Sequence, residues 1–191
     1  MKVSREQAAR NRERIVEAAA RLFRERGFEG IGVADIMKEA GLTHGGFYGH
    51  FSSKEDLIAE ASARALTHSL EHWSKLAERT RGDPLPAIAN SYLTRGHRDN
   101  PGAGCLLAAL GPDVSRQAPA VRHAVTSYVR SALEFLAPLV PGKTQAARRQ
   151  KAMRTYALLV GTMVIARAVD DRRLSQEILD AGRADLRRQL T

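Results

Sequence analysis

The sequence predicts an all-α protein, and three observations support that fold class. Apolar residues recur at helical spacing in several segments, and no segment alternates apolar and polar residues for long enough to indicate a strand. Capping residues, prolines and glycines also stand where such helices would begin and end. The chain has 191 residues, of which 43% are hydrophobic and 27% are charged. These values suit a globular protein of one or two small domains with a well-formed core.

Four helices are expected in the first part of the chain. Ser4 and Gln7 resemble a capping box that begins the first helix, and Gly27 is placed to end it. Ser53 and Asp56 have the same spacing at the start of the fourth helix. The expected ranges are about 4–26, 33–40, 43–50 and 53–80.

Five further helices are expected in the remainder of the chain. Pro84 suits the first turn of one of them, directly after a helix-breaking stretch. Residues 99–104 are the richest in turn-forming residues, and Gly111-Pro112 is expected to be a loop. The other four helices are expected at about 105–110, 119–139, 144–169 and 175–189.

The formal net charge of +9 favours an anionic partner, with nucleic acid as the first candidate. The excess lies in residues 61–191, because residues 1–60 carry 10 basic and 10 acidic side chains. Residues 1–14 are nevertheless locally basic, with a solvated basic helix face as the alternative interpretation.

Several classes of protein are disfavoured by the composition. No apolar run approaches the roughly 20 residues that span a bilayer, and the charged first residues do not resemble a secretory signal. Cys105 is the only cysteine, which excludes an internal disulfide. No cofactor motif is evident, and His68 and His72 are interpreted as a solvated helix face rather than a metal site. We therefore expect a cytoplasmic protein with neither a membrane partner nor a cofactor.

The segment from Val33 to His50 has the spacing of a helix-turn-helix, with Gly41-Leu42-Thr43 between two short helices. Gly41 can adopt the positive φ that a sharp turn needs. The second helix would then stand clear of the core and could enter a major groove. The expected core positions are Phe23, Phe28, Ile36, Leu42 and Phe51.

The longer string GLTHGGFYGHFSSKEDL follows ERIVEAAARLFRERGFEGIGVADIMKEA, and together they closely resemble the DNA-binding region of the TetR family of bacterial transcriptional regulators. The resemblance covers about residues 10–60. It implies a three-helix helix-turn-helix DNA-binding head, expected in 1–55, and a six-helix ligand-binding and dimerisation body, expected in 56–191. One departure is Gly32, which stands where the family often has a capping Thr or Ser.

The resemblance also implies the residues that contact DNA. Thr43 caps the recognition helix and can hold a phosphate there, and base contacts are expected from the residues that begin that helix. Phe47 matches a position that faces the groove, although a core position is the alternative. Tyr48, His50 and Lys54 match positions that contact phosphates. The expected DNA-binding set is Thr43, His44, Gly45, Gly46, Phe47, Tyr48, His50 and Lys54.

Residues 144–190 are expected to form two amphipathic helices that pair with those of a second copy. The alternative is that their apolar faces pack only inside one chain. A homodimer would place two recognition helices on a pseudo-palindromic operator. The expected interface contains Met153, Tyr156, Val160, Met163, Val164, Ile178 and Leu186, with Ala157, Gly161, Leu179 and Leu190 beside them.

A small-molecule pocket is expected in the middle of the chain, and its apolar residues favour a lipophilic or aromatic ligand. Each of these residues could instead be a core position. Cys105 has a second interpretation as a thiol that senses electrophiles or oxidants. The candidate ligand-binding residues are Trp73, Leu76, Tyr92, Cys105, Leu106, Tyr128 and Phe135.

Together these features predict a ligand-responsive transcriptional repressor that binds its operator as a homodimer and is released by a small lipophilic or electrophilic inducer. A sensor that acts through Cys105 and a transcriptional activator of the same family are the alternatives. A small helical enzyme would need a cluster of catalytic residues, which the sequence does not show.

Overall fold

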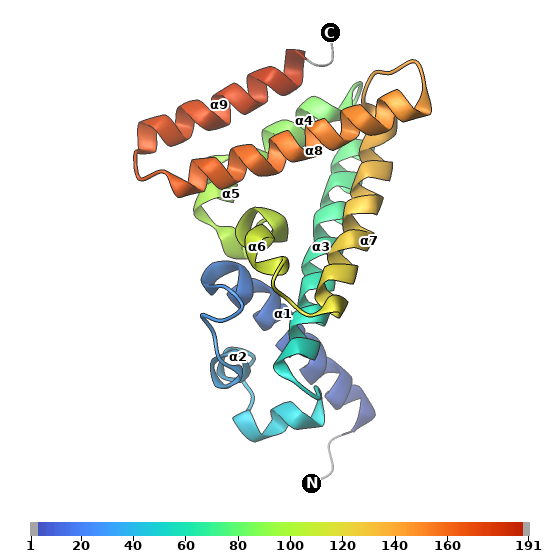
Figure 1. Ribbon diagram of the computed structural model, residues 1–191. Coiled ribbons are helices and arrows are strands. Elements are labelled where there is room, and N and C mark those ends of the chain that lie inside the picture. Colours follow the sequence, from blue (N-terminus) through green and yellow to red (C-terminus); the bar gives the residue numbers. More distant parts are fainter. Residues whose placement is uncertain (1–3, 189–191) are drawn as a thin grey trace. The chain divides into compact units, whose positions relative to one another are not determined.

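The computed structural model describes residues 4–188, and over these residues it is helical without a strand (Figure 1). The all-α fold class predicted from the sequence is confirmed. The elements in chain order are α1 (Arg5–Arg26), α2 (Val33–Glu39), the 3-10 helix η1 (His44–Gly49), α3 (Lys54–Arg79), α4 (Pro84–Tyr92), α5 (Arg95–Asp99), η2 (Pro101–Ala103), α6 (Leu106–Val114), α7 (Pro119–Leu136), η3 (Ala137–Leu139), α8 (Gln145–Ala168) and α9 (Arg172–Arg188).

The chain forms two compact units. Unit 1 contains the residues up to Thr67 together with Pro101–Val125, and unit 2 contains His68–Asn100 and the residues from Thr126 onward. The segment Pro101–Val125, which the sequence analysis assigned to the body, thus folds with the helix-turn-helix. The expected domain limits of 1–55 and 56–191 stay a prediction, because compactness alone does not define a functional domain.

The core of unit 1 forms around the apolar face of α1. Of the five predicted core residues, Phe23, Phe28, Ile36 and Phe51 are buried. Phe23 and Phe28 lie with their ring centroids 5.4 Å apart. Leu42 was expected beside them but is only partly buried. The core of this region is completed by Met37 and Phe47, which are both buried.

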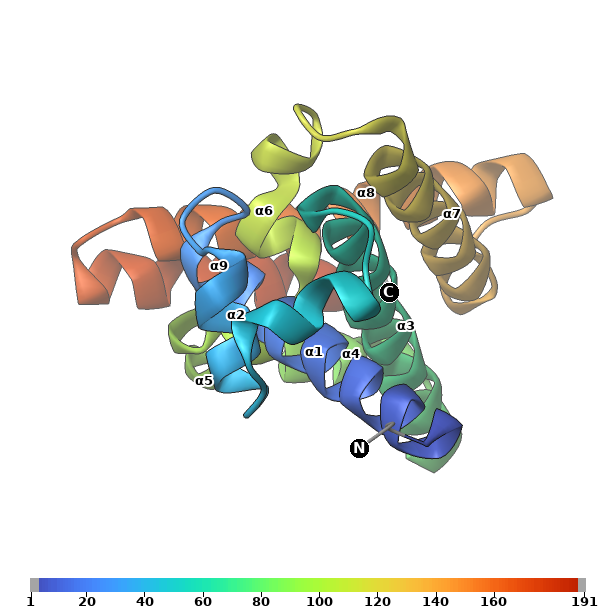
Figure 2. The ribbon, with the colours of Figure 1, turned by 90° about the horizontal axis from the view of Figure 1, so that it is seen from below.

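The turn of the helix-turn-helix depends on Gly41, which has a φ of +67°. Figure 2 shows unit 1 from below, with α1, α2 and the cyan segment that follows α2. The backbone N–H of Gly41 donates to the Lys38 carbonyl and that of Leu42 to the Met37 carbonyl, both at 2.9 Å. A Cβ at Gly41 would lie 2.6 Å from Nη2 of Arg14. The left-handed backbone therefore favours glycine here, and a larger residue would also displace the Arg14 guanidinium.

The capping residues in the sequence predicted the starts of most helices correctly. The Ser4 hydroxyl accepts from the Gln7 N–H and the Ser53 hydroxyl from the Asp56 N–H, each at 3.1 Å. The last helix begins three residues before the predicted Ser175, because the Asp171 carboxylate accepts from the N–H groups of Arg173 and Leu174.

Two predictions about the middle of the chain were wrong. The expected loop Gly111-Pro112 lies inside α6, where the buried Leu110 and Val114 keep the helix on one apolar face past the proline. The short helix α5 was not expected. Two arginines hold this part of the chain. Arg183 donates to the carbonyl of Leu93, just before the N-cap of α5, and Arg167 donates to the carbonyls of His97 and Arg98 within it.

In unit 2, α8 and α9 run side by side in opposite directions, and α4 packs against α9 (Figure 1). Gly182 of α9 lies at the closest approach, because a Cβ there would be 2.7 Å from the Thr162 methyl group. Among residues 4–188, no helix is both long enough and apolar enough to span a membrane.

The neighbouring aromatic residues of η1 give a matched test of this core. Phe47 is 1% exposed and Tyr48 is 72% exposed. We expect Phe47→Ala to lower the free energy of unfolding by about 3–5 kcal/mol, because it leaves a cavity beneath the segment. Tyr48→Ala should change it by less than about 0.5 kcal/mol. Urea unfolding measures both values, and an equal loss in the two variants would contradict the assignment.

Candidate nucleic-acid interface

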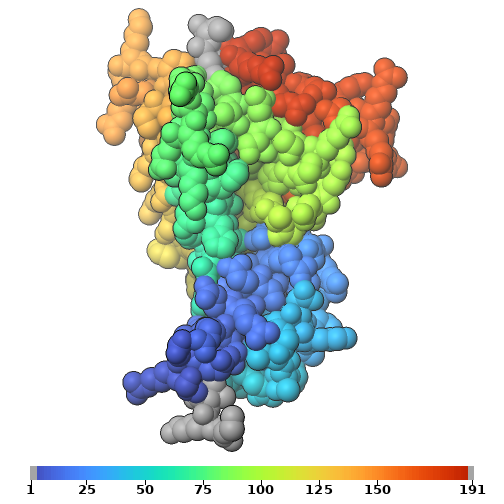
Figure 3. Space-filling model, turned by 180° about the vertical axis from the view of Figure 1, so that it is seen from behind, coloured from blue at the N-terminus to red at the C-terminus, as the bar shows by residue number. Residues whose placement is uncertain are grey.

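The residues that follow the turn form an exposed segment, η1 (His44–Gly49), which we call the recognition segment. Thr43, His44, Gly45 and Gly46 are exposed, and Tyr48 is the most exposed aromatic side chain. The space-filling view shows this part of the chain in cyan beside the dark blue of α1 (Figure 3). Unit 1 therefore presents a hydroxyl, an imidazole, a phenol and glycine backbone at one surface.

The structure corrects the expectation that Phe47 faces the groove. Its ring is buried and stacks on Phe51 with centroids 5.6 Å apart, while the Tyr48 ring meets its edge at 5.3 Å. A side chain that is 1% exposed cannot contact a thymine methyl group without leaving the core. Tyr48 is thus the aromatic side chain of the segment that is available to DNA.

The recognition segment winds as a 3-10 helix rather than the expected α-helix. The Gly46 N–H donates to the Thr43 carbonyl at 3.0 Å, and the His50 N–H donates to the Phe47 carbonyl at 2.8 Å. Three glycines in six residues explain why a regular α-helix does not form. The Thr43 hydroxyl, expected to cap this helix, makes no capping hydrogen bond.

The start of α3 places the last predicted contact residue. Lys54 is partly exposed, and its ammonium lies 3.8 Å from a carboxylate oxygen of Glu29. The pKa of Glu55 is lowered, first by a hydrogen bond from its own backbone N–H and then by the Ser53 hydroxyl. Gly32 before α2 makes no side-chain cap, as its identity predicted.

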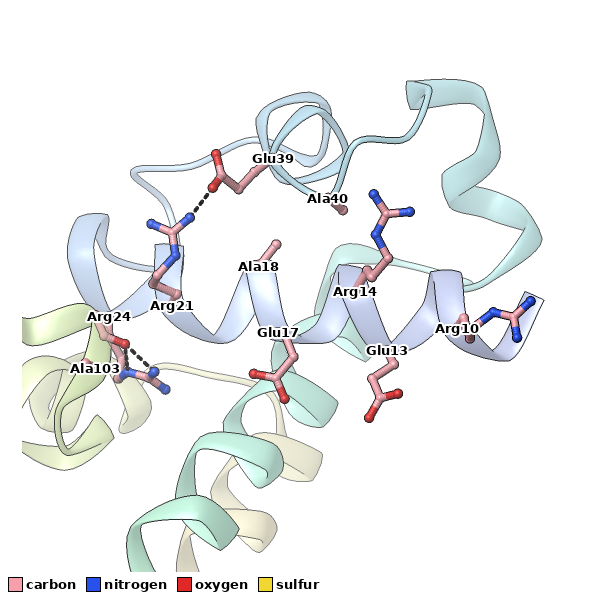
Figure 4. A pocket seen from close by; sticks show the side chains of 11 residues that line it. Arg10, Glu13, Arg14, Glu17, Ala18, Arg21, Arg24, Glu39, Ala40 and Ala103 are labelled. Atoms are coloured by element: carbon pink, nitrogen blue, oxygen red, sulfur yellow. Dashed lines mark hydrogen bonds and ion pairs between the residues drawn. The ribbon is translucent and has the colours of Figure 1, made fainter. Parts of the chain in front are cut away.

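A groove of about 710 Å³ runs along α1 within unit 1 (Figure 4). Its walls alternate in charge, and Arg21 bridges Glu39 of α2 and Glu25 of α1. Glu13 and Glu17, which also line the groove, pair with Arg64 of α3. These ion pairs tie α1 to both neighbouring helices. The groove is lined by Arg10, Glu13, Arg14, Glu17, Ala18, Arg21, Arg24, Glu39, Ala40, Gly102 and Ala103.

Arg24 attaches the segment Pro101–Val125 to α1. Its Nε and Nη2 both donate to the Gly102 carbonyl, the former at 2.9 Å. Burial lowers the pKa of the Arg24 guanidinium. A Cβ at residue 102 would lie 2.3 Å from a carboxylate oxygen of Glu25. Sequence reasoning missed this contact, because its partners are 78 residues apart in the chain.

The predicted ligand-binding residues fall in both units. Cys105 and Leu106 are buried in unit 1. In unit 2, the centroid of the Trp73 ring lies 6.0 Å from that of Tyr92, 6.3 Å from that of Phe135 and 6.1 Å from that of Tyr156. The ring centroids of Tyr128 and Tyr156 lie 6.4 Å apart, and the Leu76 side chain is partly buried. Unit 2 thus contains an aromatic cluster: Trp73, Tyr92, Tyr128, Phe135 and Tyr156.

The predicted dimer residues divide into two groups. Tyr156, Met163 and Leu186 are buried inside the chain, so the expectation that they face a second copy is corrected. Met153 and Val164 are exposed, and Val160 and Ile178 are partly exposed. Leu179 is buried, and Leu190 lies outside the described residues. Both faces of α8 are apolar, so the sequence pattern did not tell the inner face from the outer one.

Comparison with known proteins identifies this architecture. Residues 15–61 match the profile of bacterial regulatory proteins of the tetR family. YfiR of Bacillus subtilis (strain 168), named an uncharacterized HTH-type transcriptional regulator, is 34% identical over 101 residues, which are 51% of this chain and 48% of YfiR. The HTH-type transcriptional regulator TtgR of Pseudomonas putida is 36% identical over 91 residues, which are 47% of this chain and 43% of TtgR. The chain spans about half the length of these curated relatives.

Solved structures share the fold over nearly the whole chain. A TetR-family transcriptional regulator from Agrobacterium tumefaciens has a TM-score of 0.81 at 20% identity, covering 96% of this chain and 100% of that one. The reduced form of E. coli NemR has a TM-score of 0.80 at 23% identity, covering 95% and 97%. YfiR, TtgR and the Agrobacterium protein are named as transcriptional regulators rather than enzymes. Residues 15–61 thus correspond to the helix-turn-helix DNA-binding region of the tetR family of bacterial regulatory proteins, and the whole chain shares the fold of TetR-family structures.

Proposed function

We propose that the protein is a ligand-responsive transcriptional repressor that binds a pseudo-palindromic DNA operator as a homodimer. The observation that carries this proposal is the recognition segment, whose polar and glycine residues are exposed while Phe47 anchors it to the core. An element of this kind can enter a major groove without unfolding the unit that holds it.

Within this proposal, each exposed residue has a role that suits its chemistry. His44 and the backbone of Gly45 and Gly46 approach the base edges, since glycine allows close contact between backbone and groove. Thr43 and Tyr48 donate hydroxyl hydrogen bonds to phosphates. His50 and Lys54 add further phosphate contacts, which fix the register of the protein on DNA without reading its sequence. These contacts involve groups that the fold leaves exposed or partly exposed.

The homodimer in this proposal forms through α8 and α9. Outward-facing apolar and small residues follow helical spacing on both helices, which is typical of a helix-packing face. A Cβ at Gly161 would meet nothing within 4 Å, so a second helix can approach closely there. The residues assigned to this dimer face are Met153, Ala157, Val160, Gly161 and Val164 on α8, and Leu174, Ile178 and Ala181 on α9.

The inducer in this proposal is a lipophilic or aromatic small molecule that contacts the aromatic cluster of unit 2. Aromatic rings at centroid distances of 6.0–6.4 Å offer edges and faces on which another ring can pack. Such a ligand changes DNA binding only if it binds the two conformations of the dimer with different affinity. The released state would then be one whose recognition segments no longer match two successive major grooves.

Cys105 supports a second candidate, in which an electrophile or oxidant acts as the inducer. Its thiol is 5% exposed and lies in the segment that Arg24 attaches to α1, three residues after Gly102. A covalent adduct at a position this buried would require the segment to open, which would disturb its attachment to α1. Loss of induction by electrophiles in Cys105→Ser would support this candidate. Activation instead of repression stays an alternative for either kind of inducer.

Selection of bound duplexes from a random DNA pool tests the proposal. We expect a pseudo-palindrome whose half-sites lie one helical turn or a multiple apart. Binding to this selected duplex should weaken steeply with salt, because phosphate contacts release counterions. Recovery of no common sequence, together with salt-independent binding, would contradict the proposal.

Lys54→Gln tests one phosphate contact. We expect weaker binding to the selected duplex and to a shuffled duplex alike, with the salt slope reduced by about 1 per recognition segment. Lys75→Gln is the matched control, since Lys75 is a well-exposed lysine on the same helix but in unit 2. Titration at several salt concentrations measures both slopes. An equal change in the control would show that only net charge matters.

Val164→Arg tests the proposed dimer face. We expect the variant to be monomeric at micromolar concentration by light scattering, because the interface would bury an unpaired charge. Glu78→Arg, which adds an arginine to an exposed position of α3, should remain dimeric. A wild-type chain that is itself monomeric under these conditions would refute the dimer.

A further inference from the structure

The recognition segment lacks the local features that normally stabilise a helix. Three of its six residues are glycines, it winds as a 3-10 helix, and no side chain caps its beginning. Phe47 holds its middle in the core of unit 1. Directly after the segment, the N–H groups of His50 and Phe51 donate to the Phe47 carbonyl, and the His50 carbonyl has a side-chain partner of its own.

That partner is Arg12 of α1. Its Nη1 donates to the backbone carbonyl of His50, the C-cap residue that directly follows the recognition segment. The guanidinium carbon also lies 4.1 Å from the centroid of the Phe51 ring, so the cation covers the face of the next residue's side chain. One planar group thus binds His50 and Phe51, the two residues that directly follow the segment.

Glu60 of α3 orients this guanidinium. A carboxylate oxygen of Glu60 accepts from Nη2 of Arg12, while Nη1 remains on the His50 carbonyl. The two side chains are each 41% exposed, so the pair adds little to overall stability. It does fix the plane of the guanidinium, because both ends of the fork are engaged at once. Lysine cannot replace this arrangement, since a single ammonium has no planar fork.

We propose that Arg12 is a positioning residue for the reading of DNA sequence, with Glu60 as the group that orients it. Arg12 fixes the direction in which the chain leaves the recognition segment, and thereby the alignment of His44, Gly45 and Gly46 with the base edges. This inference rests on the proposed function, because it assigns a role in the same DNA-binding surface.

Substitution of Glu60 distinguishes a positioning role from a purely electrostatic one, because the two roles predict opposite changes in DNA affinity. Glu60→Gln removes a negative charge from unit 1, and by charge alone that change would strengthen binding to DNA. If Glu60 acts by orienting Arg12, the same substitution weakens binding to the selected duplex and leaves a shuffled duplex unaffected or bound more tightly. Arg10 and Glu6 provide a matched control, since they form an exposed ion pair on the same helix.

The experiment measures the affinity of the full chain for the selected duplex and for a shuffled duplex at one salt concentration. We expect Glu60→Gln to bind the selected duplex about twofold to fivefold more weakly. Arg12→Lys, which keeps the charge, should bind it about tenfold more weakly, with little change on the shuffled duplex. Arg10→Lys should match the wild type, and Glu6→Gln should match it or bind more tightly.

Two results would overturn the inference: Glu60→Gln binding the selected duplex as tightly as Glu6→Gln does, or Arg12→Lys weakening both duplexes equally. Thermal unfolding of each variant excludes a general loss of fold. If Arg12→Lys is unfolded, Glu60→Gln alone decides the question, because its ion pair is half-exposed. If the wild-type chain binds both duplexes equally well, the proposed function itself is contradicted. If the wild type prefers the selected duplex and the variants prefer it to the same degree, only the inference about Arg12 and Glu60 fails.

Discussion

The burial of Phe47 against Phe51 is the interaction on which the candidate DNA-binding surface depends. A segment with three glycines has little tendency to hold a helical shape, and its backbone hydrogen bonds are few. The buried Phe47 ring holds the segment against the core, so that the neighbouring polar groups can remain on the surface. The low helix propensity then becomes useful, because glycines bring the backbone close to whatever the segment contacts.

Arginines provide the second level of organisation in unit 1. Arg12, Arg21 and Arg24 each connect α1 to another part of the unit, and they use carbonyl as well as carboxylate acceptors. Most of these pairs are partly exposed and contribute little to stability individually. Their effect is geometric, since planar guanidinium groups fix directions between α1 and its neighbours. Unit 1 therefore includes Pro101–Val125, which is far from the helix-turn-helix in sequence.

The sequence predicted the features that depend on local chemistry. The starts of α1, α3 and α8 follow from the caps Ser4, Ser53 and Thr144, and the turn follows from Gly41. Features that depend on distant partners were not predictable in this way. The recognition segment winds as a 3-10 helix with Phe47 buried, and α5 and the residue before its N-cap are bound by Arg167 and Arg183 from other helices. The sequence did contain an indication that Arg12 contacts the core, since Arg12 lies at the edge of the apolar face of α1 that begins at Ile15.

Hydrogen exchange of the full chain, with and without the duplex that it selects, would show whether the recognition segment meets DNA. We expect DNA to increase the protection of backbone amides in residues 43–54, because the recognition segment and the start of α3 would lie against the duplex. Unchanged exchange in these residues, with new protection confined to α8 or α9, would contradict the account.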